Sequence, residues 1–266
     1  MSQYIYTSPM AQDGQPPNLI TTTKLCKSFS SGGNQQHVLR NLDLEVRKGD
    51  FTVIMGASGA GKSTLLYALS GMDSPTLGDI TFCGELISNR SSDWLAQFRR
   101  KNCGFVFQQI HLVDNMSLMD NVMAAGLLTG KNRRQVAKKA DDLFTKVGIG
   151  PVEWSKFPAQ VSGGEAQRAA IVRALINDPA IIFADEPTGS LNSEFGEAVL
   201  DMLTQANTQG QSIVMVTHDL NTASRGNRVL YLKDGIIRGE QTLGRYQGHD
   251  ETRRDTLRAF LTDMGW

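Results

Sequence analysis

The stretch FTVIMGASGAGKST, residues 51–64, decides the fold of this chain. Its first part, FTVIM, is a short apolar run typical of a strand buried on both faces of a sheet. GASGAGKS then fits the pattern GxxxxGK[ST], and residues 62–71 favour a helix. A strand, a Gly-rich loop and a helix in this order predict a phosphate-binding loop. Its residues are Gly56, Ala57, Ser58, Gly59, Ala60, Gly61, Lys62, Ser63 and Thr64.

Each residue type in this loop suits the binding of a nucleotide. Glycine lets the backbone curl so that its N–H groups approach phosphate oxygens, and the helix N-terminus adds the positive end of its dipole. Lys62 is expected to reach the β- and γ-phosphates, and the Ser63 hydroxyl is expected to ligate Mg²⁺. The alternative is a Gly-rich turn that contains a lysine by chance.

A second apolar run ends in two carboxylates, in the stretch IIFADE at residues 181–186. Asp185 at the tip of this predicted strand can hold Mg²⁺ directly or through water. Glu186 lies one residue further and is a candidate general base that polarises the attacking water. The alternative is an ordinary acidic strand end, which the phosphate-binding loop upstream makes less attractive.

Two kinds of strand and several helices predict an α/β fold. The runs at residues 51–55, 180–184 and 212–216 are continuously apolar, as in a parallel sheet, and helical segments at 62–71, 163–177 and 195–209 lie between them. Leu42, Leu44 and Val46 instead alternate with polar residues, which fits an antiparallel sheet with one wet face, and residues 19–23 are a further candidate strand.

The rest of the chain divides by composition. We expect a polar leader at residues 1–17, a mostly helical lobe at about 90–160 that contains helices at 91–100 and 133–147, and a short helix at 251–266. Residues 228–238 favour a hairpin with an Asp-Gly turn. The 266 residues therefore suit one domain of two lobes followed by a C-terminal extension from about residue 241.

Composition excludes several classes of protein. Lys and Arg number 27, as do Asp and Glu, so no dominant basic field suggests a nucleic-acid partner. Cys26, Cys83 and Cys103 lack the spacing of a zinc site and favour reduced thiols in a cytoplasmic protein. Neither a secretory signal nor an apolar run of ~20 residues is visible, so work at a membrane requires docking onto another subunit.

A third motif makes a family resemblance specific. In VSGGE, residues 161–165, Ser162 can cap a helix whose first N–H groups, at Gly163 and Gly164, are open to an anion. The longer stretch VSGGEAQRAAIVRAL, residues 161–175, resembles the signature of ABC (ATP-binding cassette) ATPases. DEPTGSLNS follows from Asp185, and His218 after SIVMVT matches the switch histidine of this family. The resemblance covers residues from about 19 to 240.

This resemblance implies a P-loop NTPase core of the RecA-like type, with a parallel sheet flanked by helices, an N-terminal antiparallel β subdomain and an inserted helical subdomain. Family members pair head to tail around two ATP molecules with Mg²⁺. The signature residues of one chain would then contact the γ-phosphate bound by the other. These residues are Ser162, Gly163, Gly164 and Glu165.

The resemblance also assigns three residues outside the motifs above. Phe29 takes the place of the aromatic residue that stacks on adenine, and Gln108 that of the glutamine that senses Mg²⁺ and the attacking water. His218 would contact the γ-phosphate and stabilise the charge that develops there. The alternatives are a core residue for Phe29, a surface amide for Gln108 and a satisfied loop histidine for His218.

Two positions depart from the family pattern. Val161 replaces the usual leucine at the start of the signature, a small apolar change. Asn192 stands where Asp is usual, which keeps the hydrogen-bonding shape but removes a charge at the dimer seam. The second change leaves the rate of hydrolysis open, although the presence of Glu186 and His218 favours an active ATPase.

The resemblance implies an ATP-hydrolysing motor subunit. It would form a homodimer and dock onto membrane permease subunits at the cytoplasmic face of the inner membrane. Finer similarity points to the branch for lipoprotein release, macrolide efflux and antimicrobial-peptide resistance. A groove near residues 110–119 would receive a permease helix. The alternative is that Ile110, Leu112, Val113 and Leu118 belong to the core of the helical lobe.

Two competing functions remain. One is a soluble ABC ATPase of DNA repair or translation. The other is a low-turnover regulatory ATPase, of which a controller of cell-wall hydrolases is a variant.

Overall fold

The computed structural model describes residues 17–31, 34–248 and 250–266. The predicted leader at residues 1–17 lies outside the described residues except for Pro17. β1 (Asn18–Ser31) and β2 (Asn34–Arg47) are both longer than the strands expected from the sequence, and they leave only residues 32–33 outside the described range between them.

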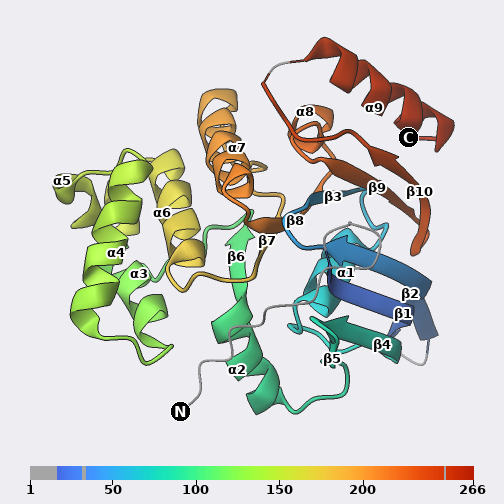
Figure 1. Ribbon diagram of the computed structural model, residues 1–266, viewed down its shortest axis with the longest axis horizontal. Coiled ribbons are helices and arrows are strands. Elements are labelled where there is room, and N and C mark those ends of the chain that lie inside the picture. The colour runs from blue at the N-terminus through green and yellow to red at the C-terminus, as the bar shows by residue number, and fades with distance from the viewer. Residues whose placement is uncertain (1–16, 32–33, 249) are drawn as a thin grey trace.

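A six-stranded sheet forms the centre of the molecule (Figure 1), in the order β10-β9-β3-β8-β7-β6. The three apolar runs are its inner strands β3 (Phe51–Met55), β7 (Ile181–Asp185) and β8 (Ser212–Thr217), and their neighbours are β6 (Cys103–Phe107) and β9 (Arg228–Lys233). These five strands are parallel. β10 (Ile236–Thr242) pairs antiparallel with β9 through the predicted Asp234-Gly235 turn.

The parallel register brings distant motifs to one edge. Met55 at the end of β3 pairs with Thr217 at the end of β8, and Asp185 at the end of β7 pairs with Val216. Phe107 at the end of β6 pairs with Asp185 in turn. The loops that follow these strands therefore start side by side at the carboxyl edge, where ligands bind in open α/β sheets.

A second sheet is antiparallel, in the order β2-β1-β4-β5, and includes β4 (Leu77–Phe82) and β5 (Glu85–Leu86). The predicted alternation is confirmed, because Leu42, Leu44 and Val46 of β2 are buried, whereas Asp43 and Glu45 between them are exposed. These side chains share one core cluster with Leu65 and Leu66 of α1 (Lys62–Leu69) and with inner strands of the large sheet. α1 is thus packed between the two sheets.

The opposite face of the large sheet is covered by later helices. α7 (Ser193–Thr208), α8 (Leu220–Ala223) and α9 (Glu251–Asp263) contribute Val199, Leu203, Ala223, Leu257 and Leu261 to a second core cluster. α9 lies against β10, where a Cβ on Gly239 would approach Phe260 and Met264. The C-terminal segment is therefore packed onto the body of the molecule (Figure 1).

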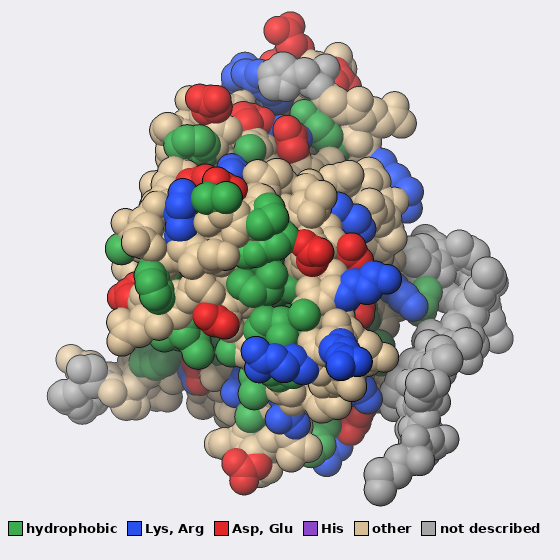
Figure 2. Space-filling view, turned by 90° about the vertical axis from the view of Figure 1, so that its left-hand side faces the viewer, with side chains coloured by type: hydrophobic (Ala, Val, Ile, Leu, Met, Phe, Trp, Pro, Cys, Tyr) green, Lys and Arg blue, Asp and Glu red, His purple; other side chains and the backbone are tan. Residues whose placement is uncertain are grey.

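Four further helices form a separate cluster on the left of Figure 1: α3 (Leu118–Leu127), α4 (Arg133–Lys146), α5 (Pro151–Trp154) and α6 (Gly163–Leu175), with a 3-10 turn at Pro158–Gln160. Val122, Val136, Phe144 and Val172 are buried at its centre. Figure 2 faces the outer side of this cluster and shows a band of apolar side chains with Lys and Arg beside it.

Part of the stretch expected to be mostly helical belongs to the sheet layers. α2 (Ser92–Asn102) packs Phe98 edge-on against Phe82 of β4, with ring centroids 4.9 Å apart, and β6 is a strand of the large sheet. Beyond residue 160, α6 packs into the helical cluster. Within the described ranges, no helix is long and apolar enough to cross a membrane.

Candidate nucleotide-binding site

The Gly-rich loop between β3 and α1 closes around the Lys62 side chain. The Lys62 ammonium donates to the carbonyl oxygens of Gly56 (2.9 Å) and Ala57 (3.1 Å) and is buried. Gly61 has φ +100°, a conformation that few other residues adopt without strain. A Cβ on Gly56 would lie 2.2 Å from the carbonyl oxygen of Leu232, so only glycine lets the loop pass this close to β9.

A pocket of about 570 Å³ opens in front of this loop. It collects side chains that follow four different strands of the large sheet: the loop after β3, Gln108 after β6, Asp185 and Glu186 at the end of β7, and His218 after β8. From the loop and α1, the pocket is lined by Ser58, Gly59, Gly61, Lys62, Ser63 and Thr64. The structure thus brings these predicted residues of a triphosphate site together, whereas Gly56, Ala57 and Ala60 of the same loop do not line the pocket.

The hydroxyl of Ser63 and the carboxylate of Asp185 meet within this pocket. Ser63 Oγ donates to Asp185 Oδ1 over 3.0 Å. Mg²⁺ prefers a few hard oxygen ligands of this kind together with phosphate oxygens, so the pair fits that ion. The phenol of Tyr67 donates to the other oxygen, Asp185 Oδ2, over 2.8 Å. Desolvation and the neighbouring carboxylate raise the pKa of Tyr67 to about 12, so the phenol stays protonated and remains a donor.

Glu186 lies one residue beyond β7 with an uncommon backbone conformation. Its φ is +44°, in the left-handed region that costs a residue with a side chain on the order of 1–3 kcal/mol. Its N–H donates to the carbonyl of Val216 over 3.0 Å and so continues the ladder between β7 and β8. Its carboxylate Oε1 lies 3.0 Å from Nδ1 of His218, whose side chain is largely exposed. Backbone strain at this position is typical of functional sites.

Gln108 borders two pockets. Its side chain lines the 570 Å³ pocket and also a neighbouring pocket of about 450 Å³. The turn after β7 packs closely against it, because a Cβ on Gly189 would lie 2.8 Å from Gln108 Nε2. Ser190 Oγ donates to the backbone carbonyl of Gln108 over 2.9 Å. Gln108 is therefore in contact with the segment that leads to Asn192 and does not behave as an isolated surface amide.

The signature residues do not line the pocket with Lys62. Ser162 caps α6: its Oγ accepts from Glu165 N–H over 3.2 Å, and its own N–H donates to Glu165 Oε2 over 2.8 Å. The Ser162 N–H and Oγ both donate to Glu165 Oε2, and these two hydrogen bonds hold the pKa of Glu165 below its usual value. Gly163, at the first helical position, lines the neighbouring 450 Å³ pocket. Within one chain, the phosphate-binding loop and the start of the signature helix thus line different pockets.

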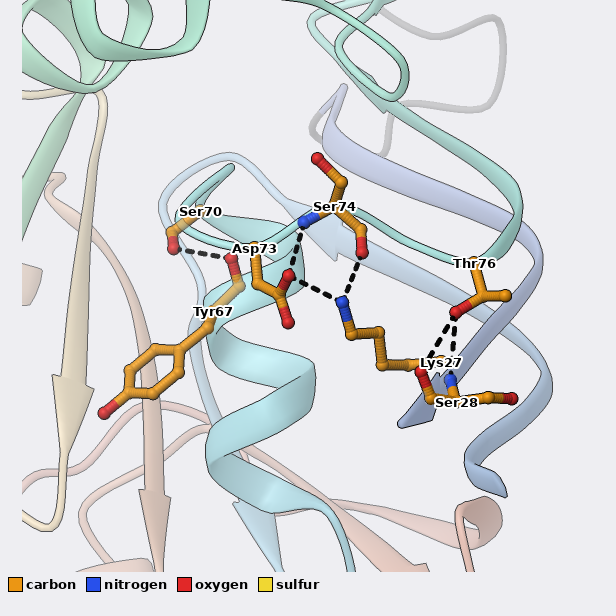
Figure 3. Close-up of polar contacts among 7 residues, drawn as sticks. All are labelled: Lys27, Ser28, Tyr67, Ser70, Asp73, Ser74 and Thr76. Carbon is orange, nitrogen blue, oxygen red and sulfur yellow. Dashed lines mark hydrogen bonds and ion pairs between the residues drawn. The ribbon is translucent and has the colours of Figure 1, made fainter. Parts of the chain in front are cut away.

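Phe29 on β1 is 45 % exposed, which argues against the core-packing alternative. It does not line the 570 Å³ pocket. The Lys27 ammonium lies 5.0 Å from the centroid of the Phe29 ring. Figure 3 shows that the same ammonium donates to Asp73 Oδ1 (2.6 Å) and to the carbonyl of Ser74 (2.7 Å). The segment after α1 therefore supports the strand that carries Phe29.

Asn192 is the N-cap of α7. Its side chain accepts a hydrogen bond from the Phe195 N–H over 3.0 Å. Asn and Asp are about equally good in this position, because both place an acceptor oxygen in front of the free N–H groups of a helix. Within the chain, the departure from the usual aspartate thus leaves the capping geometry intact.

The sequence motifs did not predict two residues of the site, Tyr67 and Gln167. Tyr67 follows Ser63 by four residues, a spacing that puts both on one helix face and was a usable signal. Gln167 on α6 is fully buried, and its Nε2 donates to the carbonyls of Phe107 (3.0 Å) and Pro187 (2.9 Å). These carbonyls directly precede Gln108 and directly follow Glu186. No local pattern in the sequence distinguishes this glutamine from an exposed one.

Two other pockets help to delimit the site. The 450 Å³ pocket lies where the sequence predicts a groove; Ile110 and Leu112 line it, Val113 is exposed, and Leu118 is instead fully buried in the helical cluster. A larger pocket of about 610 Å³ includes Ala180 and Ser212, next to the amino ends of β7 and β8. It contains none of the candidate residues.

Comparisons with known proteins give the family. A family model described as "ABC transporter" matches residues 39–189. The ATP-binding protein LolD of the lipoprotein-releasing system of Idiomarina loihiensis is 39% identical over 84% of this chain and 98% of its own. The bacitracin export ATP-binding protein BceA of Halalkalibacterium halodurans is 38% identical over 93% of this chain and 96% of its own.

Some relatives are much longer, and the chain matches only about a third of their length. The macrolide export ATP-binding/permease protein MacB of Mannheimia succiniciproducens is 40% identical over 83% of this chain but only 34% of its own length.

Solved structures agree with these relatives. The dimeric cassette MJ0796 superposes with a TM-score of 0.78 at 35% identity, covering 85% of this chain and all of that one. A dimer of the same cassette in a post-hydrolysis state with ADP and Pi gives a TM-score of 0.77 at 34% identity over the same shares of the two chains. With the pocket described above, these matches establish that the chain belongs to the ABC transporter family, as one of its ATP-binding and ATP-hydrolysing cassettes.

Proposed function

We propose that this cassette is the motor subunit of a transporter in which a separate permease crosses the membrane. The observation that carries the proposal is the division of the nucleotide site. Lys62, Ser63, Glu186 and His218 line one pocket, whereas the capped N-terminus of α6 at Ser162 lies outside it. A second copy of the chain is needed to bring a signature to the triphosphate.

Within the pocket, each side chain has a chemical role in ATP hydrolysis. Lys62 and His218 stabilise the negative charge on the γ-phosphoryl group as it is transferred. Glu186 accepts a hydrogen bond from the attacking water and acts as general base. Ser63 and Asp185, together with Gln108, would hold Mg²⁺. When bound, that ion neutralises charge on the β- and γ-phosphates.

The signature of the second copy completes the site. Gly163 and Gly164 begin α6, so their N–H groups are among the free donors of a helix N-terminus. Presented to the γ-phosphate of the partner chain, they bind ATP more favourably than ADP. ATP therefore closes the homodimer and hydrolysis reopens it, since a ligand shifts an equilibrium through its differential contacts with the two states.

A short permease helix fits the 450 Å³ pocket. Ile110 and Leu112 supply apolar contacts, and exposed Val113 continues the surface. Because Gln108 lines both this pocket and the nucleotide pocket, a partner seated here would contact a residue that also borders the nucleotide. In this proposal the chain works at the cytoplasmic face of the inner membrane, bound through the permease.

The names of the relatives support one class of cargo. Proteins named for lipoprotein release, bacitracin export and macrolide export favour export or extraction of lipoproteins, peptides or drugs over uptake. A soluble cassette of DNA repair or translation is disfavoured, because these relatives of about 40% identity are named for lipoprotein release and for bacitracin or macrolide export. The zero formal charge gives no reason to expect a nucleic-acid partner.

Co-purification tests this function. Tagged Glu186→Gln, with ATP present, is purified from detergent-solubilised host membranes, and the retained proteins are identified by mass spectrometry. A multi-spanning permease with a large extracytoplasmic domain is expected, and Lys62→Ala is the matched control that should lose it. Recovery of soluble protein alone, with nucleic acid or ribosomes, contradicts the transport function in favour of the soluble ABC ATPase.

A further inference from the structure

Two hydroxyl groups of α1 hold the two oxygens of one carboxylate. Ser63 Oγ donates to Asp185 Oδ1 over 3.0 Å, and Tyr67 Oη donates to Asp185 Oδ2 over 2.8 Å. Ser63 and Tyr67 are four residues apart, so they lie one turn apart on the same face of the helix. Asp185 is the last residue of β7, and its carboxylate is thus fixed from both sides by a single element.

The end of α1 that carries Tyr67 is itself firmly anchored. The carbonyl of Tyr67 accepts hydrogen bonds from Met72 N–H (2.9 Å), Asp73 N–H (3.1 Å) and Ser70 Oγ (3.0 Å). Asp73 in turn forms the ion pair with Lys27 of β1. Figure 3 shows this cluster on one side of the Tyr67 backbone and the phenol pointing away from it. The hydrogen bonds at this end of α1 therefore fix the backbone of the residue whose hydroxyl donates to Asp185.

The two donors are not equivalent. The Ser63 oxygen can donate its hydrogen to Asp185 while its lone pairs face a metal ion, so it belongs to the ligand set itself. The Tyr67 side chain does not line the nucleotide pocket, and it packs against the core cluster of the two sheets. Without it, Oδ2 loses this donor and the carboxylate gains freedom to rotate. Groups that orient metal ligands in this way commonly change metal affinity 10- to 100-fold.

We infer that the Tyr67 hydroxyl is a positioning group that fixes the Asp185 carboxylate for the divalent cation that accompanies the nucleotide. The inference rests on the proposed function, in which Asp185 holds that cation. The competing account is a structural one: a half-buried phenol finds Asp185 as a convenient acceptor and contributes only to packing.

Metal binding without turnover separates the two accounts. Mn²⁺ is titrated into the full chain saturated with ADP, and the protein-bound ion is followed by electron paramagnetic resonance after subtraction of the same titration of ADP alone. Tyr67→Phe keeps the ring and removes the donor, so Mn²⁺ affinity is expected to fall about tenfold. Tyr246→Phe removes a phenol hydroxyl from a ring that lies against Arg225 and Arg253; it is the matched control and should have no effect.

A second readout excludes a general loosening of the loop. The affinity for ADP in EDTA should be the same for Tyr67→Phe and the wild type. Unchanged Mn²⁺ affinity in Tyr67→Phe overturns the inference, as does a tenfold loss of ADP affinity in EDTA. Asp185→Asn tests separately whether Asp185 holds the cation, as the proposed function requires. If this variant leaves Mn²⁺ affinity unchanged, the proposed metal site is wrong, whatever the result for Tyr67→Phe.

Discussion

The Nδ1 atom of His218 lies 3.0 Å from the Oε1 atom of Glu186, although the two residues are 32 positions apart in the chain. Each directly follows an inner strand of the parallel sheet, and the pairing of β7 with β8 sets the two loops side by side. The left-handed backbone of Glu186 turns its side chain into the pocket. The imidazole and the carboxylate thus form a pair in front of the phosphate-binding loop.

His218→Ala removes the imidazole from this pair. We expect kcat for ATP hydrolysis to fall about 10²-fold with little change in KM, because the side chain stabilises charge that develops in the transition state. Steady-state phosphate release measures it. Combined with Glu186→Gln, the loss should be far smaller than the product of the two single losses, since the residues act as a unit. A fully multiplicative loss would show that they act independently.

Gln167→Leu removes the amide that joins two backbone segments of the site. The partly buried carbonyl of Phe107 and the buried carbonyl of Pro187 lose their donor, so the free energy of unfolding should drop by about 1–3 kcal/mol. A lower kcat is expected as well, because these carbonyls flank Gln108 and Glu186. Denaturant unfolding and phosphate release are the measurements. Gln205→Leu on the exposed face of α7 is the control and should change stability by less than about 0.5 kcal/mol.

Two substitutions of Asn192 test its role as a helix cap separately from the effect of a charge at this position. Asn192→Ala loses the cap of α7 and should cost about 1 kcal/mol of stability, whereas Asn192→Asp should equal or slightly exceed the wild type because it adds a negative charge at a helix N-terminus. Thermal unfolding of the three chains gives the order. If Asn192→Asp is as unstable as Asn192→Ala, Asn192 does not act as the cap.

Arg253 fastens the C-terminal helix. Its guanidinium donates to the carbonyls of Ser224 (2.6 Å), Leu243 (2.7 Å) and Gly244 (2.9 Å) and also to that of Gly226. Arg253→Met leaves these acceptors without their partner, so α9 should lose amide protection in hydrogen exchange. Arg258→Met, at an exposed position of the same helix, is the control. Equal protection of α9 in both variants contradicts the anchoring role.

The sequence predicted the parts of the molecule that depend on local chemistry. The α/β class, the antiparallel sheet and the Asp234-Gly235 hairpin are confirmed, because apolar runs, alternation and turn residues each act over a few positions. The lengths of the strands could not be predicted as well. β1 continues through polar residues up to Ser31, because it pairs with β2 along nearly its whole length and with β4 over part of it. Tertiary pairing supplies hydrogen bonds that no local pattern encodes.

Sequence motifs predicted the residues that line the candidate pocket, but they did not predict the side chains that hold those residues in position. Lys62, Ser63, Asp185 and Glu186 stand in stretches whose spacing already dictates their place at strand ends. Tyr67 and Gln167 act through partners more than 15 residues away in the chain, and each is an ordinary helical residue until the fold puts an acceptor in reach. The packing of α2 beside β4 likewise depends on contacts between Phe98 and Phe82.

The central claim is that the signature of one chain binds the nucleotide held by another, and Gly163 tests it most directly. A Cβ at Gly163 meets only Leu191, at an ordinary 3.7 Å, so the chain itself tolerates a side chain there, whereas a Cβ at Gly164 would lie 2.7 Å from the Phe195 ring. Gly163→Asp also suits the first position of a helix, while it puts a negative charge where the partner's γ-phosphate would lie.

The measurement is the molar mass of Glu186→Gln in ATP, by size-exclusion chromatography with light scattering, with and without Gly163→Asp. The account predicts a dimer for Glu186→Gln and a monomer for the double variant, with fluorescent ATP still bound by the monomer through its own phosphate-binding loop. A double variant that remains dimeric in ATP, or a Glu186→Gln chain that never dimerises, would contradict the shared site.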